Sequence, residues 1–366
     1  MKNSPIVGKH QGLSAKMADF GGWLMPIEYP KTGAIEEYNS VRNNVGIFDV
    51  SHLGKVSVIG KGATNFLNEQ FTNDLSKIID GQAQYTLMCN SQGGVIDDLI
   101  AYRNSDSDYF LIPNAANTAS VYEVLKANAP AGISVENLHE QFAVFALQGP
   151  KSFELLNSLG VDCSLDYMAF SKSNFDGTDA ILCRTGYTGE LGFEIIPTWQ
   201  DAGKVWDLLC NSVISLGGAV CGLGARDLLR TEMGYPLHGH ELTLDISPIQ
   251  ASASWAVDLN KPNFTGKQIL LDQKQNGTTH KLKAILATDR AIPRKDMQVK
   301  DQSGNLIGQV TSGTFSPSLK KGIGLALISS EISEGDQVIV DVRGRDSVFE
   351  VVTLPFVPSR VLSKKS

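Results

Sequence analysis

Two adjacent carboxylates, Asp97 and Asp98, stand in the stretch Val95–Tyr102, whose other residues are mostly apolar and typical of a buried strand. An ionised carboxylate among Leu and Ile side chains costs several kcal/mol unless neighbouring groups hydrogen-bond it. We therefore expect this pair either to be satisfied structurally, through a cap or an ion pair, or to be kept for chemistry.

The two carboxylates lie on a predicted hairpin. Strands over Tyr85–Cys89 and Val95–Tyr102 flank the polar, Gly-rich loop Ser91–Gly94. A loop of this length pairs Asn90 with Val95 and Leu87 with Asp98. Because side chains alternate along a strand, Asp97 faces one way and the opposite face carries Tyr85, Leu87, Ile96, Asp98 and Ile100.

A second stretch that could bind a ligand runs from residue 184 to 196 and has a glycine at every third position. This spacing differs from the Gly-x-Gly-x-x-Gly of dinucleotide-binding folds, so we reject that interpretation. The segment is either a plain hairpin loop or a place where a flat ligand approaches the backbone. In the second case Tyr187 stacks on the ligand and Glu194 accepts its hydrogen bonds.

Arg226 and Arg230 stand four residues apart in a predicted helix that starts near Gly222. They share one helical face and could grip a carboxylate by bidentate hydrogen bonds. An ordinary ion pair with Asp227 or Glu232 is the alternative for at least one of them.

The histidines and cysteines favour structural roles. His52, at the end of a predicted strand, is more typical of a packed residue, and His238-Gly239-His240 has no second ligand pair at metal-binding spacing, which favours a turn and predicts no metal site. The five cysteines are widely spaced and lack Cys-x-x-Cys, as expected in a reducing cytoplasm.

Composition restricts the class of protein. A chain of 366 residues with 42% hydrophobic and 19% charged residues predicts two or three globular domains, with disorder expected only at residues 363–366. A net charge of −7 argues against broad nucleic-acid binding. No apolar run could cross a bilayer, and residues 1–11 lack the core of a signal peptide, so we expect a cytoplasmic protein.

The elements that must position these residues form three groups. Strands mix with helices over residues 55–126, and a second unit of similar pattern follows from residue 142. After linker-like residues 273–279, six short strands from residue 282 predict a small antiparallel barrel. Within them, residues 311–317 read as a turn that faces the other units.

Seven stretches make the chain resemble the aminomethyltransferase (T-protein) family of the glycine cleavage system. Each is weak alone, but their common order and spacing are specific to the folate-dependent T-protein superfamily. They are Phe20–Pro26, Phe48–His52, Gly93–Asp98, Leu147–Pro150, Thr185–Glu190, Gly222–Asp227 and Thr311–Gly313.

The resemblance implies an α+β fold shaped as a three-domain cloverleaf around a tetrahydrofolate-binding channel. Residues 1–54 and 140–275 correspond to the first α+β unit, and residues 55–139 to a second unit inserted in it. Residues 280–366 correspond to a C-terminal antiparallel β-barrel.

The same resemblance implies roles for single residues. The second aspartate of the family's Asp-Asp pair is catalytic, which corresponds to Asp98, and Asn114 matches a supporting asparagine. A basic residue near the folate tail corresponds to the candidate Arg360. The folate-contacting positions fall on Tyr85, Tyr187, Glu194 and Arg226.

The implied reaction moves the aminomethyl carbon from the lipoyl arm of H-protein to tetrahydrofolate. Ammonia is released and 5,10-methylenetetrahydrofolate forms, without a metal. The implied partners are H-protein and the other components of the glycine cleavage system, with neither nucleic acid nor membrane.

Two alternatives remain. A folate-dependent demethylase of dimethylsulfoniopropionate shares the fold, although the Asp97-Asp98 pair and Ser51-His52 favour the T-protein. A noncatalytic folate-binding factor of iron–sulfur assembly would show Lys-Gly-Cys-x-x-Gly-Gln, where this chain has Thr185-Gly186-Tyr187-Thr188-Gly189-Glu190.

Overall fold

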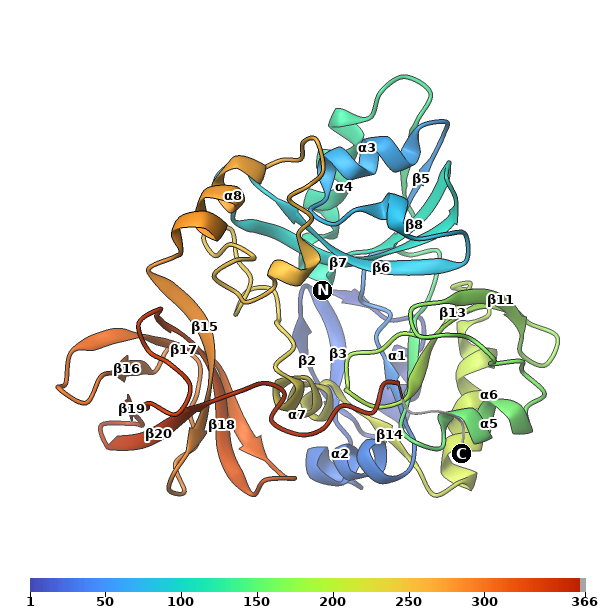
Figure 1. The fold of residues 1–366 in the computed structure, drawn as a ribbon. Coiled ribbons are helices and arrows are strands. Elements are labelled where there is room, and N and C mark those ends of the chain that lie inside the picture. The colour runs from blue at the N-terminus through green and yellow to red at the C-terminus, as the bar shows by residue number, and fades with distance from the viewer. Residues whose placement is uncertain (363–366) are drawn as a thin grey trace.

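The computed structural model describes residues 1–362, and the end predicted to be disordered, residues 363–366, lies outside the described residues. Helices and strands gather in three lobes around a common centre (Figure 1). A mixed α+β architecture with a separate C-terminal barrel was expected, and both are present.

The first lobe is built on a six-stranded sheet whose strands come from both sides of residues 55–139. Strand β4 (Gly46–Asp49) lies between β10 (Phe145–Gln148), to which it is antiparallel, and β14 (Ala219–Cys221), to which it is parallel. The sheet order is β11 (Phe170–Asn174), β12 (Asp179–Cys183), β13 (Gly192–Pro197), β10 (Phe145–Gln148), β4 (Gly46–Asp49) and β14 (Ala219–Cys221).

Both faces of this sheet are buried. Along β10, Phe145 and Leu147 pack into one core with helices α5 (Ser152–Ser158) and α6 (Ala202–Ser215). Ala146 points the opposite way, as the two-residue period of a strand requires. That second core contains helices α2 (Gly33–Asn43) and α7 (Leu223–Met233), strand β3 (Trp23–Glu28), and apolar residues of the second lobe.

A short sheet near the N-terminus borders this second core. Its order is β1 (Lys2–Asn3), β3 (Trp23–Glu28) and β2 (Lys16–Phe20), and helix α1 (Val7–Gly12) lies between β1 and β2 in the chain.

The second lobe is an antiparallel sheet covered by helices α3 (Ala63–Gln70) and α4 (Thr118–Asn128). Short 3-10 turns η1 (Leu75–Lys77) and η2 (Ala115–Asn117) connect its elements. The strand order is β6 (Gln82–Cys89), β7 (Val95–Ser105), β8 (Asp108–Ile112), β5 (Val56–Ile59) and β9 (Ser134–Asn137).

The predicted hairpin is β6–β7, and Leu87 does pair with Asp98. The pairing of Asn90 with Val95 was wrong, because a bulge places Cys89 opposite Val95. The bulge also interrupts the alternation, so Ile96 packs into the core of the second lobe instead of sharing the Asp98 face. The loop rests on residues 242–270, where a Cβ on Gly94 would meet the Leu244 carbonyl oxygen at 1.7 Å.

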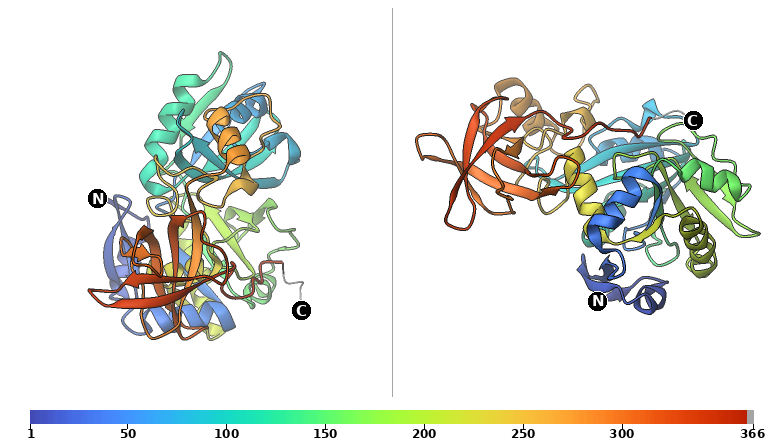
Figure 2. Two further views of the ribbon diagram at one scale, coloured as in Figure 1. Left: turned by 60° about the vertical axis from the view of Figure 1, so that its left-hand side comes forward. Right: turned by 90° about the horizontal axis from the view of Figure 1, so that it is seen from below.

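The C-terminal lobe is a closed six-stranded antiparallel barrel, which stands at one end of the molecule (Figure 2). Two sequence predictions near it were wrong. Helix α8 (Lys267–Asn276) occupies part of the expected linker, and residues 311–316 continue a strand instead of forming a turn. The barrel consists of β15 (His280–Ala287), β18 (Lys321–Ser329), β17 (Leu306–Ser316), β16 (Gln298–Lys300), β19 (Gln337–Asp341) and β20 (Asp346–Val352).

A buried charge cluster joins the barrel to the first lobe. The Arg42 guanidinium donates to Glu190 Oε1 at 2.8 Å and to Glu232 Oε2 at 2.7 Å. Glu232, on α7, also accepts hydrogen bonds from the Tyr38 hydroxyl on α2 and from Ser316 at the end of β17. All these groups are excluded from water, so each charge depends on its partners.

We expect Arg42→Met to lower the free energy of unfolding by about 3–5 kcal/mol, because two carboxylates then stay buried without their counter-charge. Urea denaturation of the whole chain measures this change. The matched control is Lys9→Ala, which breaks the exposed Lys9–Asp207 pair and should cost no more than about 1 kcal/mol. Equal losses in the two variants would contradict the importance of the cluster.

Candidate functional site

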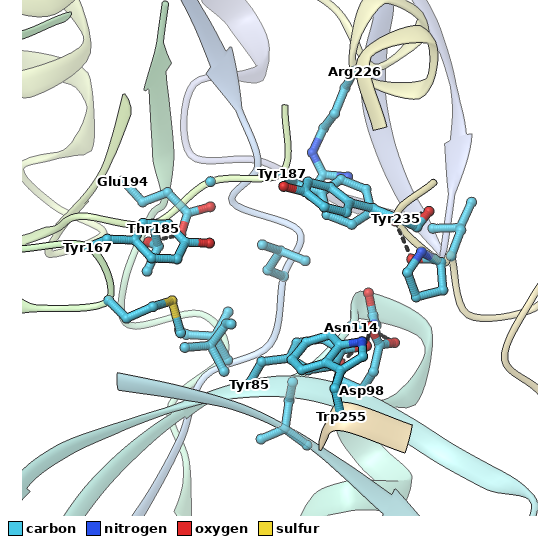
Figure 3. A pocket seen from close by; sticks show the side chains of 18 residues that line it. Tyr85, Asp98, Asn114, Tyr167, Thr185, Tyr187, Glu194, Arg226, Tyr235 and Trp255 are labelled. Carbon is cyan, nitrogen blue, oxygen red and sulfur yellow. Dashed lines mark hydrogen bonds between the residues drawn. The ribbon is translucent and has the colours of Figure 1, made fainter. Parts of the chain in front are cut away.

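A cavity of about 200 Å³ opens where the first two lobes and the irregular segment 235–255 meet (Figure 3). One wall is the β6–β7 hairpin, the second is the loop before β13 together with Glu194, and the third is the start of α7. Six of the seven predicted site residues line it with polar groups, and Arg360 does not. The six are Tyr85, Asp98, Asn114, Tyr187, Glu194 and Arg226.

Asp98 is held at the floor of this cavity. The Tyr85 hydroxyl donates to Asp98 Oδ2 at 2.9 Å, and Asn114 Nδ2 donates to Asp98 Oδ1 at 2.8 Å. Asp97 is fully buried and accepts from the Asn114 backbone N–H at 2.9 Å and from Asn117 Nδ2 at 2.7 Å. Asp97 is thus satisfied by the protein itself, whereas Asp98 also faces the cavity.

Burial raises the pKa of Asp98, and the hydrogen bond from Tyr85 opposes that rise. The pKa of Asp97 is also raised, first by burial and then by the neighbouring Asp98 charge. The two carboxylates interact directly through their charges, so they titrate as a pair. Such a pair can stabilise positive charge that develops close to it.

Tyr187 of the second wall and Arg226 of the third wall contact each other. The Arg226 guanidinium lies 4.3 Å from the centre of the Tyr187 ring, over its face, and the Tyr187 hydroxyl donates to the Pro236 carbonyl. Figure 3 shows the ring of Tyr187 and that of Tyr85 on different sides of the open space. A flat ligand therefore fits between aromatic surfaces here.

Glu194 lies across the cavity from Asp98 (Figure 3). The Thr185 hydroxyl donates a hydrogen bond to Glu194 Oε2. Burial raises the pKa of Glu194, while the Thr185 bond and the Arg226 charge lower it. Glu194 also lines the cavity, so its carboxylate can accept a hydrogen bond from the donor edge of a ligand.

Sequence reasoning missed three aromatic residues of the lining, Tyr167, Tyr235 and Trp255. The indole of Trp255 stacks on Tyr85 with ring centres 5.1 Å apart and is 68% exposed. In the sequence, Trp255 stands out only as an aromatic residue in a long segment without regular periodicity. Such segments often carry binding residues.

Arg230 and Arg360 do not line the cavity. Arg230 is buried in bonds to Asp227, Glu241 and Ser312, so the structural alternative of an ion pair holds for it. Arg360 donates to the Arg42 carbonyl at 3.1 Å, and its side chain is half exposed. Contact between Arg360 and a ligand tail therefore stays a prediction.

His238 and His240 contact other parts of the protein. His238 Nε2 lies 3.0 Å from the Val95 carbonyl, and His240 Nδ1 lies 3.1 Å from Ser312 Oγ. Among residues 1–362, no group of three or more His, Cys, Asp or Glu side chains has the geometry of a metal site. Over the same residues, no helix is both long and apolar enough to cross a membrane.

Comparison with known proteins matches both parts of the chain. Residues 6–261 match the GCVT N-terminal domain, and residues 281–358 match the glycine cleavage T-protein C-terminal barrel domain. Aminomethyltransferases from Parafrankia sp. and Mycobacterium tuberculosis are 53% and 51% identical, over 98% and 97% of this chain and 98% and 96% of theirs.

A solved structure agrees with these sequence relatives. The crystal structure of the glycine cleavage system aminomethyltransferase T from Bartonella henselae superposes with a TM-score of 0.92 at 32% identity, over 98% of this chain and 99% of that one. Close identity, full coverage and the shared fold lead to one conclusion. The chain belongs to the aminomethyltransferase family, the T-proteins of the glycine cleavage system.

Proposed function

We propose that this chain transfers the aminomethyl carbon from the lipoyl arm of H-protein to tetrahydrofolate, which releases ammonia and yields 5,10-methylenetetrahydrofolate. Its family consists of one-carbon transferases that use tetrahydrofolate as a substrate and work with H-protein. The observation that carries the proposal is a carboxylate, Asp98, at the floor of an aromatic cavity that admits a flat ligand.

Asp98 is the proposed catalytic residue. As the carbon leaves sulfur, positive charge develops on the N–CH2 unit, and a fixed carboxylate stabilises that charge without reorganising. Tyr85 and Asn114 hold the carboxylate in one orientation, so its position is set before substrate arrives. Its main contribution is therefore electrostatic and not proton removal.

The remaining residues bind tetrahydrofolate in this proposal. Glu194 accepts hydrogen bonds from the pterin, while Tyr85 and Tyr187 pack against its ring, with Trp255 extending the stack. Arg226 secures a polar group of the ligand, and Arg360 meets the folate tail. The stacked aromatic pair and the guanidinium over Tyr187 support this assignment.

We further propose that the reaction needs no metal and takes place in the cytoplasm, with the other glycine cleavage components and without nucleic acid or membrane. We also propose the domain bounds 1–54 with 140–275, then 55–139, then 280–366. The separate sheets of the first two lobes and the closed barrel support this division.

Asp98→Asn keeps the size of the side chain and removes its charge. We expect kcat to fall by about 10²-fold or more, with the KM for tetrahydrofolate nearly unchanged. Ammonia release from aminomethyl-lipoyl H-protein, with and without tetrahydrofolate, measures both parameters. The control is Asp80→Asn, at an exposed ion pair with Arg103. Near-normal turnover of Asp98→Asn would reject the catalytic role.

The pH profile tests the environment of Asp98. Activity should fall as pH drops through the raised pKa of this group, since only the ionised carboxylate stabilises positive charge. Asn114→Ala removes a bond that lowers the pKa of Asp98, so the acid limb should move to higher pH. Asn117→Ala removes a bond to Asp97 alone and should move the limb less; equal movement would argue against this geometry.

Glu194→Gln should raise the KM for tetrahydrofolate roughly 10-fold or more, because a charge-assisted hydrogen bond becomes a neutral one. The KM for H-protein should change little.

Arg360→Gln tests the predicted contact with the folate tail, and its KM is measured with mono- and polyglutamylated tetrahydrofolate. An unaltered KM for both forms would remove Arg360 from the site and leave the Glu194 prediction intact.

A further inference from the structure

A second, smaller cavity of about 190 Å³ adjoins the site. The two cavities share four lining residues, Leu53, Asn114, Arg226 and Leu237, so they meet at the floor and the Arg226 wall. The second one continues toward the end of β2, the η2 turn and the turn at residues 237–240. None of the roles proposed above for the substrate-binding residues uses this space.

His52 gives the second cavity its unusual feature. The side chain lines the cavity and is only 1% exposed, and Nδ1 has no hydrogen-bond partner among residues 1–362. The edge-on contact with Phe20, whose ring centre is 5.2 Å away, holds the imidazole in place. A buried polar atom without a partner is costly, so this nitrogen is a candidate for binding a small polar molecule.

The charges around His52 decide which molecule fits. Burial and the Arg226 charge lower the pKa of His52 to about 3, so its imidazole stays neutral and one ring nitrogen is an acceptor. Lys55 and His139 act in the same direction as Arg226, and Asp49 acts against them. The Arg226 cation disfavours a second cation in this space, and the acceptor nitrogen of His52 requires a hydrogen-bond donor, which an anion without protons cannot supply. A neutral donor therefore suits both groups.

Two amides add acceptors. Asn114 directs Nδ2 to both the Asp97 and Asp98 carboxylates, and Asn117 directs Nδ2 to Asp97. Each Oδ1 therefore stands at the opposite end of its amide group, and both residues line the second cavity. A neutral molecule with several N–H donors and the size of water matches these acceptors and the available space.

We propose that the second cavity receives the ammonia released by the reaction as neutral NH3, which donates a hydrogen bond to His52. This inference rests on the proposed function. In that reaction the C–S and C–N bonds of the aminomethyl unit break and two bonds to the folate nitrogens form. One folate proton ends on the departing amine and the other on sulfur, so NH3 leaves without a net proton and becomes ammonium in bulk water.

The reverse reaction isolates this step, because ammonia is then a substrate. We expect His52→Leu to raise the KM for ammonia at least 10-fold, while the KM for 5,10-methylenetetrahydrofolate stays within 2-fold. His52→Gln, which returns an acceptor of similar reach, should recover part of the loss. When the pH is varied, the KM of the unaltered protein should stay constant if it is calculated from the concentration of NH3. The KM calculated from the concentration of ammonium should change with pH.

The matched control is His139→Gln. His139 Nε2 lies 2.8 Å from the backbone carbonyl oxygen of His52, but His139 does not line the cavity. The His139→Gln substitution therefore disturbs the same packing without changing the proposed site. An unchanged ammonia KM in a folded His52→Leu protein would overturn the inference, as would equal losses in His139→Gln. Absence of ammonia formation by the unaltered protein would instead reject the proposed function.

Discussion

Two neighbouring carboxylates in the middle of a sheet depend on hydrogen-bond donors, and the most important of these follow the adjacent strand and reach both groups. Asn114, directly after β8, supplies its backbone N–H and its side-chain amide to Asp97 and Asp98. This arrangement buries one carboxylate as a structural group and leaves the other beside open space. The asymmetry between the two is the basis of the chemistry proposed here.

The cavity exists only when the lobes are docked. Arg226 is carried by α7, which packs on the first sheet and also contacts the barrel through Arg230 and Ser312. The Arg42–Glu232 cluster fixes the same C-terminal end of this helix. None of the barrel residues 280–352 lines the main cavity. Through its contacts with α7, however, the barrel helps to determine where the Arg226 cation lies.

Arg226 lines both cavities, and its charge acts on a different kind of acceptor in each. Toward the main cavity its charge lowers the pKa of Glu194 and covers the face of Tyr187. Toward the smaller cavity it helps to keep His52 neutral. One buried cation thus favours an ionised acceptor on one side and an uncharged acceptor on the other. This asymmetry suits the proposed binding of folate in the main cavity and the proposed departure of a neutral product through the smaller one.

The sequence by itself determined the elements whose periodicity is local. The Leu87–Asp98 pairing and the six barrel strands follow from alternation and turn residues, and the position of Asp98 beside Tyr85 follows from that parity. Only the tertiary structure decided the bulge near Ile96, the burial of Arg230 and the stacking of Trp255 on Tyr85. The stacking joins two segments far apart in the chain, and Arg230 is buried by contacts with Glu241 and with Ser312 of the barrel. The bulge depends on a single inserted residue. None of these features leaves a periodic signal in the sequence.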